Sequence, residues 1–373
     1  MRVVNSSMYN KFTASVNDVH GKLNKAMNKV STGAAYENAA ENPLAYYRGK
    51  QIDQLYQNAK SRNALIGDLK NRLYEQEQGA YNIQQLLNGA KTAVQFLSDG
   101  THNTDKNTVQ TKRDELLQRA QSMVNKLNAQ YGNYYVFGGN DVTTPPFSLS
   151  EDGSALTFTH KFTDGTTETM TMTMKYDAQT KSYGYEISGK DLDLMLKAMR
   201  EQGRVDIGYG NIDNPDTLLD TYTGGLNVLT GLTSDALKSM TDDDAKAAIK
   251  EGLNKSALGL TSIGVMASDQ YIKGDIDSSA FTDVMGKLNT DMAAASQTLS
   301  RVYADLGNKS NLLDETSKQL DNLEDSLTVQ YKDLLGADPY ESIMEMFSYQ
   351  YSYSAALKVG SNLMQSSLFD FLT

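Results

Sequence analysis

Apolar residues recur at alternating intervals of three and four over an unusually long stretch of this chain. From Ile52 to Leu97, twelve of the fourteen positions in the series are aliphatic or alanine, and no proline interrupts them. This spacing is the heptad pattern of a long helix that packs lengthwise against other helices. At about 1.5 Å per residue, a helix from Pro43 to Leu97 would be roughly 80 Å long. The chain is therefore predicted to fold around long helices.

A second series with the same spacing lies near the other end of the chain. It runs from Leu299 to Leu334 and extends back to Phe281. Two helices of similar length, each with one apolar stripe, cannot bury their stripes alone and are natural partners. A turn-rich break at 98–105 separates the first long helix from a third, which is expected to end near Tyr131. The predicted fold class is mainly α, with a long antiparallel coiled-coil helical rod formed by the N- and C-terminal regions.

Between the long helices the apolar period changes from about 3.6 to 2. Alternating segments at 156–162, 170–176 and 183–187 predict β-strands. Short helices are expected at 191–200, 235–240 and 243–253. The thioethers of Met170, Met172 and Met174 share one face of their strand and are expected to fill a core. The middle of the chain is thus predicted to be an inserted, β-rich mixed domain.

These patterns divide the chain into five consecutive segments. Residues 1–42 are an N-terminal assembly helix and residues 43–139 are the N-terminal half of the rod. Residues 140–280 are the inserted outer domain. Residues 281–338 are the C-terminal half of the rod, and residues 339–373 are a C-terminal assembly helix.

The two terminal segments have amphipathic patterns of their own. A single helix with a narrow apolar stripe is marginal in water, so each one needs a partner within the chain or in a neighbouring subunit. Residues 1–50 hold seven basic and three acidic side chains, whereas residues 301–373 hold five basic and eleven acidic ones. Opposite charges favour the meeting of the two ends. The residues expected to make intersubunit assembly contacts are Phe12, Val16, Val19, Leu23, Val30, Ile343, Phe347, Leu357, Met364, Leu368 and Phe371.

Composition and charge exclude several classes of function. The formal net charge is −11, which is unsuited to binding a nucleic acid backbone. No run of 18 apolar residues is present, so no membrane-spanning helix is expected. The N-terminal residues lack the apolar core and cleavage site of a secretory signal peptide.

No motif of catalysis, cofactor binding or metal binding is complete in this sequence. The chain has no Cys, and its Gly-Lys pairs are not followed by Ser or Thr as a phosphate-binding loop requires. The segment that begins at Asp275 lacks the glycine and the glutamate of a calcium loop. Three histidines, His20, His102 and His160, lie in separate segments and are expected to be ordinary surface residues. No catalytic, cofactor-binding or metal-binding residue is therefore predicted.

Short motifs near both ends occur in a recognisable order. Ser31-Thr32-Gly33 leads to Asn42-Pro43, Tyr135-Val136-Phe137-Gly138-Gly139 is followed by Pro145-Pro146-Phe147, and residues 367–372 read Ser-Leu-Phe-Asp-Phe-Leu. As an ordered set they resemble the flagellar hook-filament junction proteins, the hook-associated protein 3 family, which are relatives of flagellin. The resemblance covers roughly residues 1–147 and 281–373.

The resemblance implies a structural subunit of the bacterial flagellum rather than an enzyme. It implies export by the flagellar type III apparatus without a cleaved signal peptide, and an extracellular location. The partners implied are a ring of like subunits, the first hook-associated junction protein, flagellin, and a cytoplasmic export chaperone at the C-terminal segment. Residues 34–41 depart from the family, which usually carries a basic residue and an acidic pair there.

Two other interpretations remain open at the level of sequence. The chain could be a flagellin or another flagellin-like filament subunit. From a different class, it could be an exported adhesin or effector with a helical stalk, in which residues 140–280 bind a ligand. The second interpretation predicts ordered terminal helices in a stable monomer.

Overall fold

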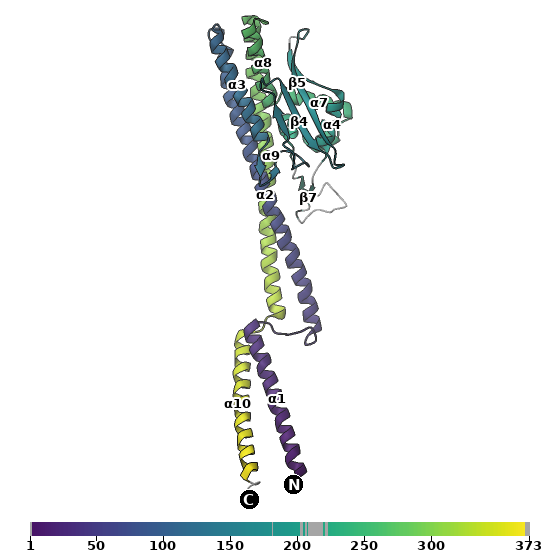
Figure 1. Cartoon of the computed structure of the whole chain (residues 1–373), viewed down its shortest axis with the longest axis vertical. Coiled ribbons are helices and arrows are strands. Elements are labelled where there is room, and N and C mark those ends of the chain that lie inside the picture. Colours follow the sequence, from purple (N-terminus) through teal and green to yellow (C-terminus); the bar gives the residue numbers. More distant parts are fainter. Residues whose placement is uncertain are drawn as a thin grey trace. The chain divides into compact units, whose positions relative to one another are not determined.

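The computed structural model describes residues 2–180, 182–201, 204–205, 207, 219–220 and 223–369. The described chain is mainly helical and has a small antiparallel sheet region (Figure 1). It divides into two compact units. We call Met1–Asn63 with Lys318–Thr373 the terminal unit, and Ala64–Ser317 the central unit.

Four helices contribute to the terminal unit. They are α1 (Arg2–Thr32), the first part of α2 (Pro43–Leu97), the last part of α9 (Ser278–Leu335) and α10 (Pro339–Phe369). Both α2 and α10 begin at a proline, which suits a first helical position because its missing N–H would have no helical partner. The side chain of Asn42 accepts a hydrogen bond from the Ala45 amide at 3.1 Å, and Asp338 caps α10 in the same way through Tyr340 at 2.8 Å.

A short backbone bridge joins the two segments that connect these helices. The amide of Ala35 donates to the carbonyl of Leu335 at 2.8 Å, and the amide of Ala337 donates to the carbonyl of Gly33 at 2.9 Å. Gly33 has a φ of +69°, a left-handed conformation that glycine adopts without strain at the end of a helix. The predicted break at Ser31-Thr32-Gly33 is thus the end of α1.

The long helices α2 and α9 continue into the central unit, where they run antiparallel. The side-chain amide of Gln84 donates to the hydroxyl of Ser300 at 2.6 Å, and the rings of Tyr81 and Tyr303 are 6.1 Å apart. The third helix, α3 (Lys106–Leu127), begins after Asp105, whose carboxylate accepts hydrogen bonds from the amides of Asn107 and Thr108. The predicted apolar stripe of α2 is buried here, from Ile66 to Leu97.

The sheet contains the three strands expected from sequence and one that was not expected. Its order is β3 (Phe147–Leu149), β4 (Ala155–Lys161), β5 (Thr167–Asp177) and β6 (Ser182–Ile187), all antiparallel. Met170, Met172 and Met174 are at most 1% exposed, as their alternation in sequence predicts. The remaining short strands form two separate pairs, β1 (Gln130–Tyr131) with β2 (Tyr134–Tyr135) and β7 (Arg204–Val205) with β8 (Leu219–Asp220).

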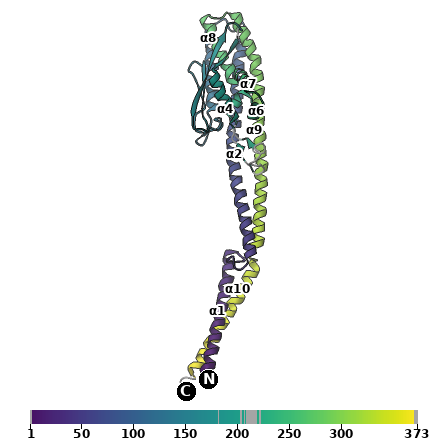
Figure 2. The same ribbon diagram turned by 90° about the vertical axis from the view of Figure 1, so that its right-hand side faces the viewer.

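Five helices follow this sheet in the described chain before α9, and three of them contact its strands. The five helices are α4 (Gly189–Arg200), α5 (Gly225–Thr230), α6 (Ser234–Lys238), α7 (Asp242–Asn254) and α8 (Ala257–Lys273). The three acidic residues that follow Thr241 lie in the first turn of α7, where they complement the helix dipole. Figure 2 shows the sheet and these helices from a second side.

Helix α8 was not predicted as a continuous element. Its residues are apolar or small on nearly every side, and most of them are buried. Because no polar face interrupts it, the segment lacks the 3.6-residue period that marks a surface helix. Gly264 lets α8 approach Leu116, Val94 and Leu288, which belong to three different helices. The inserted segment therefore shares its core with α2, α3 and α9 in the central unit.

Two apolar residues of the predicted stripes are exposed. Leu55 on α2 is 55% exposed and Leu323 on α9 is 45% exposed. A straight helix has 3.6 residues per turn, so a strict alternation of three and four drifts away from the contact line over several turns. The assignment of Leu55 and Leu323 to the buried stripes is therefore corrected.

Candidate assembly surface

Helices α1 and α10 pack side by side and antiparallel in the terminal unit (Figure 1). Three contacts define their register. The ammonium of Lys29 is 3.2 Å from the carboxylate of Glu345, the rings of His20 and Tyr353 are 5.2 Å apart, and Phe12 lies against Gly360. The two chain ends thus provide each other with one partner.

The residues predicted for assembly on α1 mostly face α10. Phe12, Val16, Val19 and Leu23 are half-buried, and Ala26 in the same stripe is 1% exposed. Only Val30, at the end of the stripe, is exposed, to 39%. Within one chain, this stripe is already largely occupied by α10.

The residues of α10 predicted for assembly are exposed where the structure describes their side chains. Ile343, Phe347 and Leu357 are 40%, 56% and 50% exposed. Met364 and Leu368 belong to α10, but their side chains lie outside the described residues, as does the whole of Phe371. The residues of α10 that are buried or half-buried toward α1 form a different stripe, which sequence analysis missed: Ser342, Met346, Tyr349, Tyr353, Ala356 and Gly360.

A second apolar stripe lies on the other side of α10. Tyr340, Met344, Phe347 and Tyr351 follow one another at intervals of four, three and four, and are 77%, 55%, 56% and 80% exposed. At 3.6 residues per turn, this series lies opposite the series that faces α1. We call it the outer stripe of α10. A helix that is apolar on two opposite sides is normally buried on both.

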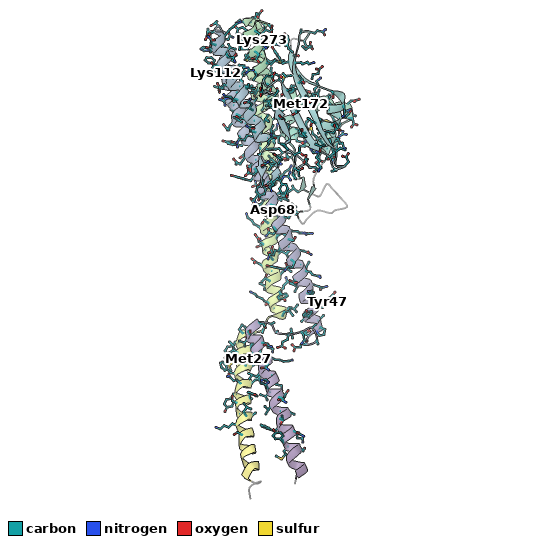
Figure 3. The ribbon with its side chains drawn as sticks, in the orientation of Figure 1. Met27, Tyr47, Asp68, Lys112, Met172 and Lys273 are labelled. Carbon is teal, nitrogen blue, oxygen red and sulfur yellow. The ribbon has the colours of Figure 1, made fainter. Side chains whose placement is uncertain are left out.

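Exposed apolar side chains are concentrated in the terminal unit. Of the 24 large apolar side chains exposed in the described part of the chain, 18 belong to this unit, which holds about a third of the residues. Figure 3 shows two of them, Met27 on α1 and Tyr47 on α2. Apolar surface gathered in one region marks a site of protein association.

The segment 34–41, where the sequence departs from the resembled family, carries its own polar contacts. The carboxylate of Glu41 is 2.7 Å from the ammonium of Lys25, and Glu37 accepts a hydrogen bond from the side chain of Asn28 at 2.9 Å. The hydrogen bond from Lys25 lowers the pKa of Glu41, and the same contact raises the pKa of Lys25. These acidic residues hold the segment against the last turns of α1.

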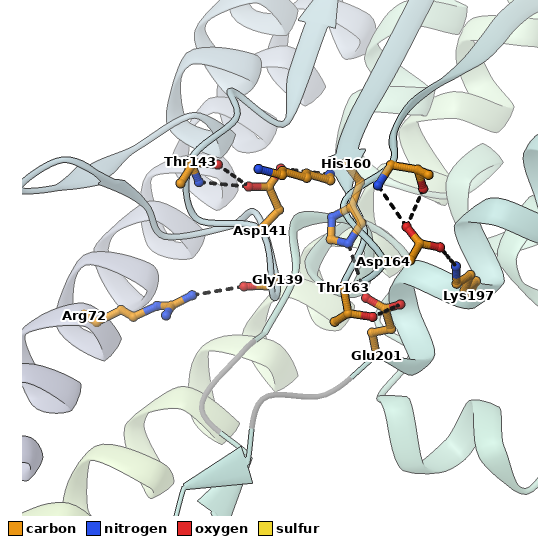
Figure 4. A network of polar contacts seen from close by, with 11 residues as sticks. Arg72, Gly139, Asp141, Thr143, His160, Thr163, Asp164, Lys197 and Glu201 are labelled. Atoms are coloured by element: carbon orange, nitrogen blue, oxygen red, sulfur yellow. Dashed lines mark hydrogen bonds and ion pairs between the residues drawn. The ribbon is translucent and has the colours of Figure 1, made fainter.

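A buried polar network lies in the central unit (Figure 4). Asp141 accepts hydrogen bonds from the amide and hydroxyl of Thr143 and the amide of Thr144, and its other oxygen accepts one from the Lys161 amide at 2.9 Å. Burial opposes ionisation of this carboxyl, but the hydrogen bonds outweigh it and lower the pKa of Asp141. Nearby, the guanidinium of Arg72 donates to the carbonyl of Gly139 at 3.3 Å. The segment that contains Gly139 and Asp141 is thereby tied to both α2 and β4.

The expectation that His160 is a surface residue is wrong. It is 1% exposed, because the alternation of β4 places it on the same buried face as Leu156 and Phe158. Neither ring nitrogen has a hydrogen-bond partner among the described residues, and Nε2 is 3.8 Å from a carboxylate oxygen of Glu201. Burial lowers the pKa of His160. His20 and His102 are exposed, as expected.

Among the described residues, no group of three or more His, Asp and Glu side chains is placed to hold a metal ion. In the same part of the chain, none of the helices is both long and apolar enough to cross a lipid bilayer.

The fold and this surface define a class of protein built on long helices with an incompletely covered terminal helix pair. No model of a protein family matches the sequence, and no curated protein matches it. Among solved structures, the fold is similar to that of a protein from Vibrio parahaemolyticus described as a candidate flagellar hook-associated protein. The two chains are 13% identical, with a TM-score of 0.51, and the match covers 79% of this chain and 100% of the other. At this identity the likeness shows a common fold.

Proposed function

We propose that this protein is a structural subunit of the bacterial flagellum that joins the hook-side junction to the flagellin filament. The observation that carries the proposal is the outer stripe of α10, whose four large apolar side chains are each more than half exposed although α10 is already paired with α1. A monomer gains nothing from such a surface, whereas an assembly that covers it buries apolar area on every subunit. The fold likeness to a hook-associated protein and the ordered sequence motifs support the flagellum as that assembly.

The proposed partners follow from the same resemblance. Like subunits would form a ring, with the first hook-associated junction protein on one side and flagellin on the other. A cytoplasmic chaperone would cover the C-terminal segment before export through the flagellar type III apparatus, and the assembled protein would lie outside the cell. The proposed role is structural and not catalytic.

The test uses Phe347, which belongs both to the predicted assembly residues and to the outer stripe. Phe347→Asp would place a carboxylate in a dry contact, at a cost on the order of 3–5 kcal/mol per subunit. Because Phe347 is 56% exposed in the single chain, the free energy of unfolding of the monomer should change by no more than about 0.5 kcal/mol. Negative-stain microscopy of the protein mixed with hook ends and flagellin should show that the variant fails to attach.

The matched control is Ser352→Asp, one residue beyond Tyr351 and away from the outer stripe. Ser352 is exposed, and its hydroxyl donates to the carbonyl of Ser348 on its own helix. This variant should attach to hook ends better than Phe347→Asp. Normal attachment of Phe347→Asp would show that the outer stripe is not an interface, and failure of the unmodified protein to attach would contradict the flagellar role.

A further inference from the structure

A second pair of exposed stripes lies on α2 and α9 within the terminal unit. On α2, Leu44, Tyr47 and Leu55 are 59%, 62% and 55% exposed, and Arg48 and Gln51 lie exposed between them. These residues are three or four apart and therefore lie along one side of the helix. That side is offset from the buried residues Ala45 and Gly49, and Gly49 lies against Leu335 of α9. We call this series the basic stripe.

The corresponding series on α9 is acidic. Val329 is 57% exposed, and the exposed residues Asp325 and Asp333 lie four positions before and after it. The side of α9 that faces α2 carries Leu320 and Leu327, which are 7% and 4% exposed. At 3.6 residues per turn, Val329 points away from that buried side. We call this series the acidic stripe.

The contacts between α2 and α9 place the two stripes at the same height. Gly49 lies against Leu335, and the side-chain amide of Asn63 donates to the carboxylate of Asp321 at 2.6 Å. In an antiparallel pair with this register, Leu55 is level with Val329, and Gln51 is level with Asp333. Arg48 is one helical turn from Gln51, so its long side chain can reach the level of Asp333.

We propose that the basic stripe of one copy packs against the acidic stripe of the next copy, with Leu55 on Val329 and Arg48 paired with Asp333. This inference rests on the proposed function, because it names the surface through which like subunits would meet. It concerns α2 and α9, and not the outer stripe of α10.

The charges favour a second copy in this head-to-tail arrangement. Within the described part of the terminal unit, Arg48 and Asp333 make no ion pair at 4.0 Å or less, so both remain available to a neighbour. A contact between two basic stripes at the same height would bring Arg48 near the Arg48 of the other copy, which costs free energy. A contact between unlike stripes pairs opposite charges instead, and its repetition generates a ring or a helix.

The absence of cysteine from the sequence permits a direct test by cross-linking. Two single variants, Leu55→Cys and Val329→Cys, are prepared in the full-length chain, mixed and oxidised with copper phenanthroline. A disulfide forms only when the two Cα atoms come within about 7 Å, and it accumulates even from a weak contact because it is covalent. The mixture should give at least about tenfold more covalent dimer than either variant alone, the ratio that corresponds to a preference of roughly 1.4 kcal/mol.

The matched control replaces Val329→Cys by Gln330→Cys, which is also exposed but points to another side of α9. This mixture should give little dimer. Arg48→Glu on the Leu55→Cys chain should reduce the mixed dimer, and Asp333→Arg on the Val329→Cys chain should restore it. Loss without restoration would contradict the proposed ion pair.

Other outcomes separate this inference from the proposed function. A dimer that forms mainly from Leu55→Cys alone, or no enrichment in the mixture, would overturn the contact between unlike stripes. Attachment to hook ends without the mixed dimer would overturn the contact and leave the flagellar role standing. Formation of the mixed dimer without attachment to hook ends would support the contact and contradict the flagellar role.

Discussion

The ring of Phe12 on α1 lies directly over Gly360 on α10, so that a Cβ atom at position 360 would be 2.7 Å from the ring. Glycine in the middle of a helix costs about 0.5–1 kcal/mol relative to alanine. At this position the absence of a side chain lets the two terminal helices approach closely. The contact ties together residues near the two ends of the sequence.

A side chain at position 360 should weaken this helix pair. Gly360→Val must displace the Phe12 ring, and such overpacking costs about 1–3 kcal/mol. Hydrogen exchange of the amides of α1 and α10 in the isolated protein measures the change, and exchange should become faster in both helices. The control is Gly21→Ala, which has no atom within 4 Å of its added Cβ and should slow exchange. Unchanged exchange in Gly360→Val would show that this contact does not hold the pair.

The close approach of α8 gives a similar prediction for the central unit. A Cβ atom at Gly264 would lie 3.1 Å from Leu116, with Val94 and Leu288 just beyond. Gly264→Val should therefore lower the free energy of unfolding of the central unit by about 1–3 kcal/mol. Thermal unfolding followed by circular dichroism measures it, with Gly286→Ala on α9 as the control because that position is open. An unchanged melting temperature would show that α8 packs less tightly against the long helices than its burial indicates.

The buried imidazole of His160 predicts a loss of stability in acid. Burial lowers its pKa below the ordinary 6.5, so the unfolded chain binds a proton that the folded chain does not. Below pH 6.5 the free energy of unfolding should therefore fall with a slope of up to about 1.4 kcal/mol per pH unit. Urea unfolding of the protein between pH 7 and 5 should show this slope, and His160→Phe should reduce it.

His102 serves as the control for this pH dependence. Its side chain is 48% exposed and stacks on Phe96, with the ring centroids 4.3 Å apart. His102→Phe keeps the buried imidazole of His160 and should therefore still lose stability below pH 6.5. A slope that persists in His160→Phe and disappears in His102→Phe would show that His102, and not His160, causes the loss of stability in acid.

The carboxylate of Asp141 should contribute measurably to the free energy of unfolding. Four hydrogen bonds end on it, and it is 5% exposed. Asp141→Asn replaces one acceptor oxygen by a donor that faces other donors, which costs about 1–3 kcal/mol. Chemical unfolding should show this loss, whereas Asp152→Asn, in a more exposed turn, should have a smaller effect. Equal losses in the two variants would contradict a special role for the Asp141 network.

The sequence by itself determined the elements that repeat over many residues. The stripe from Ile66 to Leu97 predicts a long helix with one buried side, and alternation at 156–162 and 170–176 predicts two strands of the sheet. These patterns are readable because one side of each element is buried and the other is wet. The breaks at Gly33, Pro43 and Pro339 are equally local, since proline and glycine restrict or free the backbone wherever they occur.

Helix α8 was not predicted from sequence, and the burial of His160 was missed although the alternation over 156–162 implies it. Helix α8 is enclosed on nearly all sides by elements that are distant in the chain, so no polar face gives it a period. His160 is a polar residue in a buried register, and its position follows from the strand alternation rather than from its own chemistry. In both cases the surrounding elements determine the burial.

Sequence predicted one part of the assembly surface, and the tertiary structure decided the other part. Sequence showed that both terminal helices need partners. It assigned a single apolar stripe to each helix, whereas α10 has two apolar stripes. Only the tertiary structure decided that Met346, Tyr353 and Gly360 lie toward α1 while Phe347 and Tyr351 stay exposed. The physical reason is that a helix that is apolar on two opposite sides has no single preferred side, so the neighbouring helix selects the side that it buries.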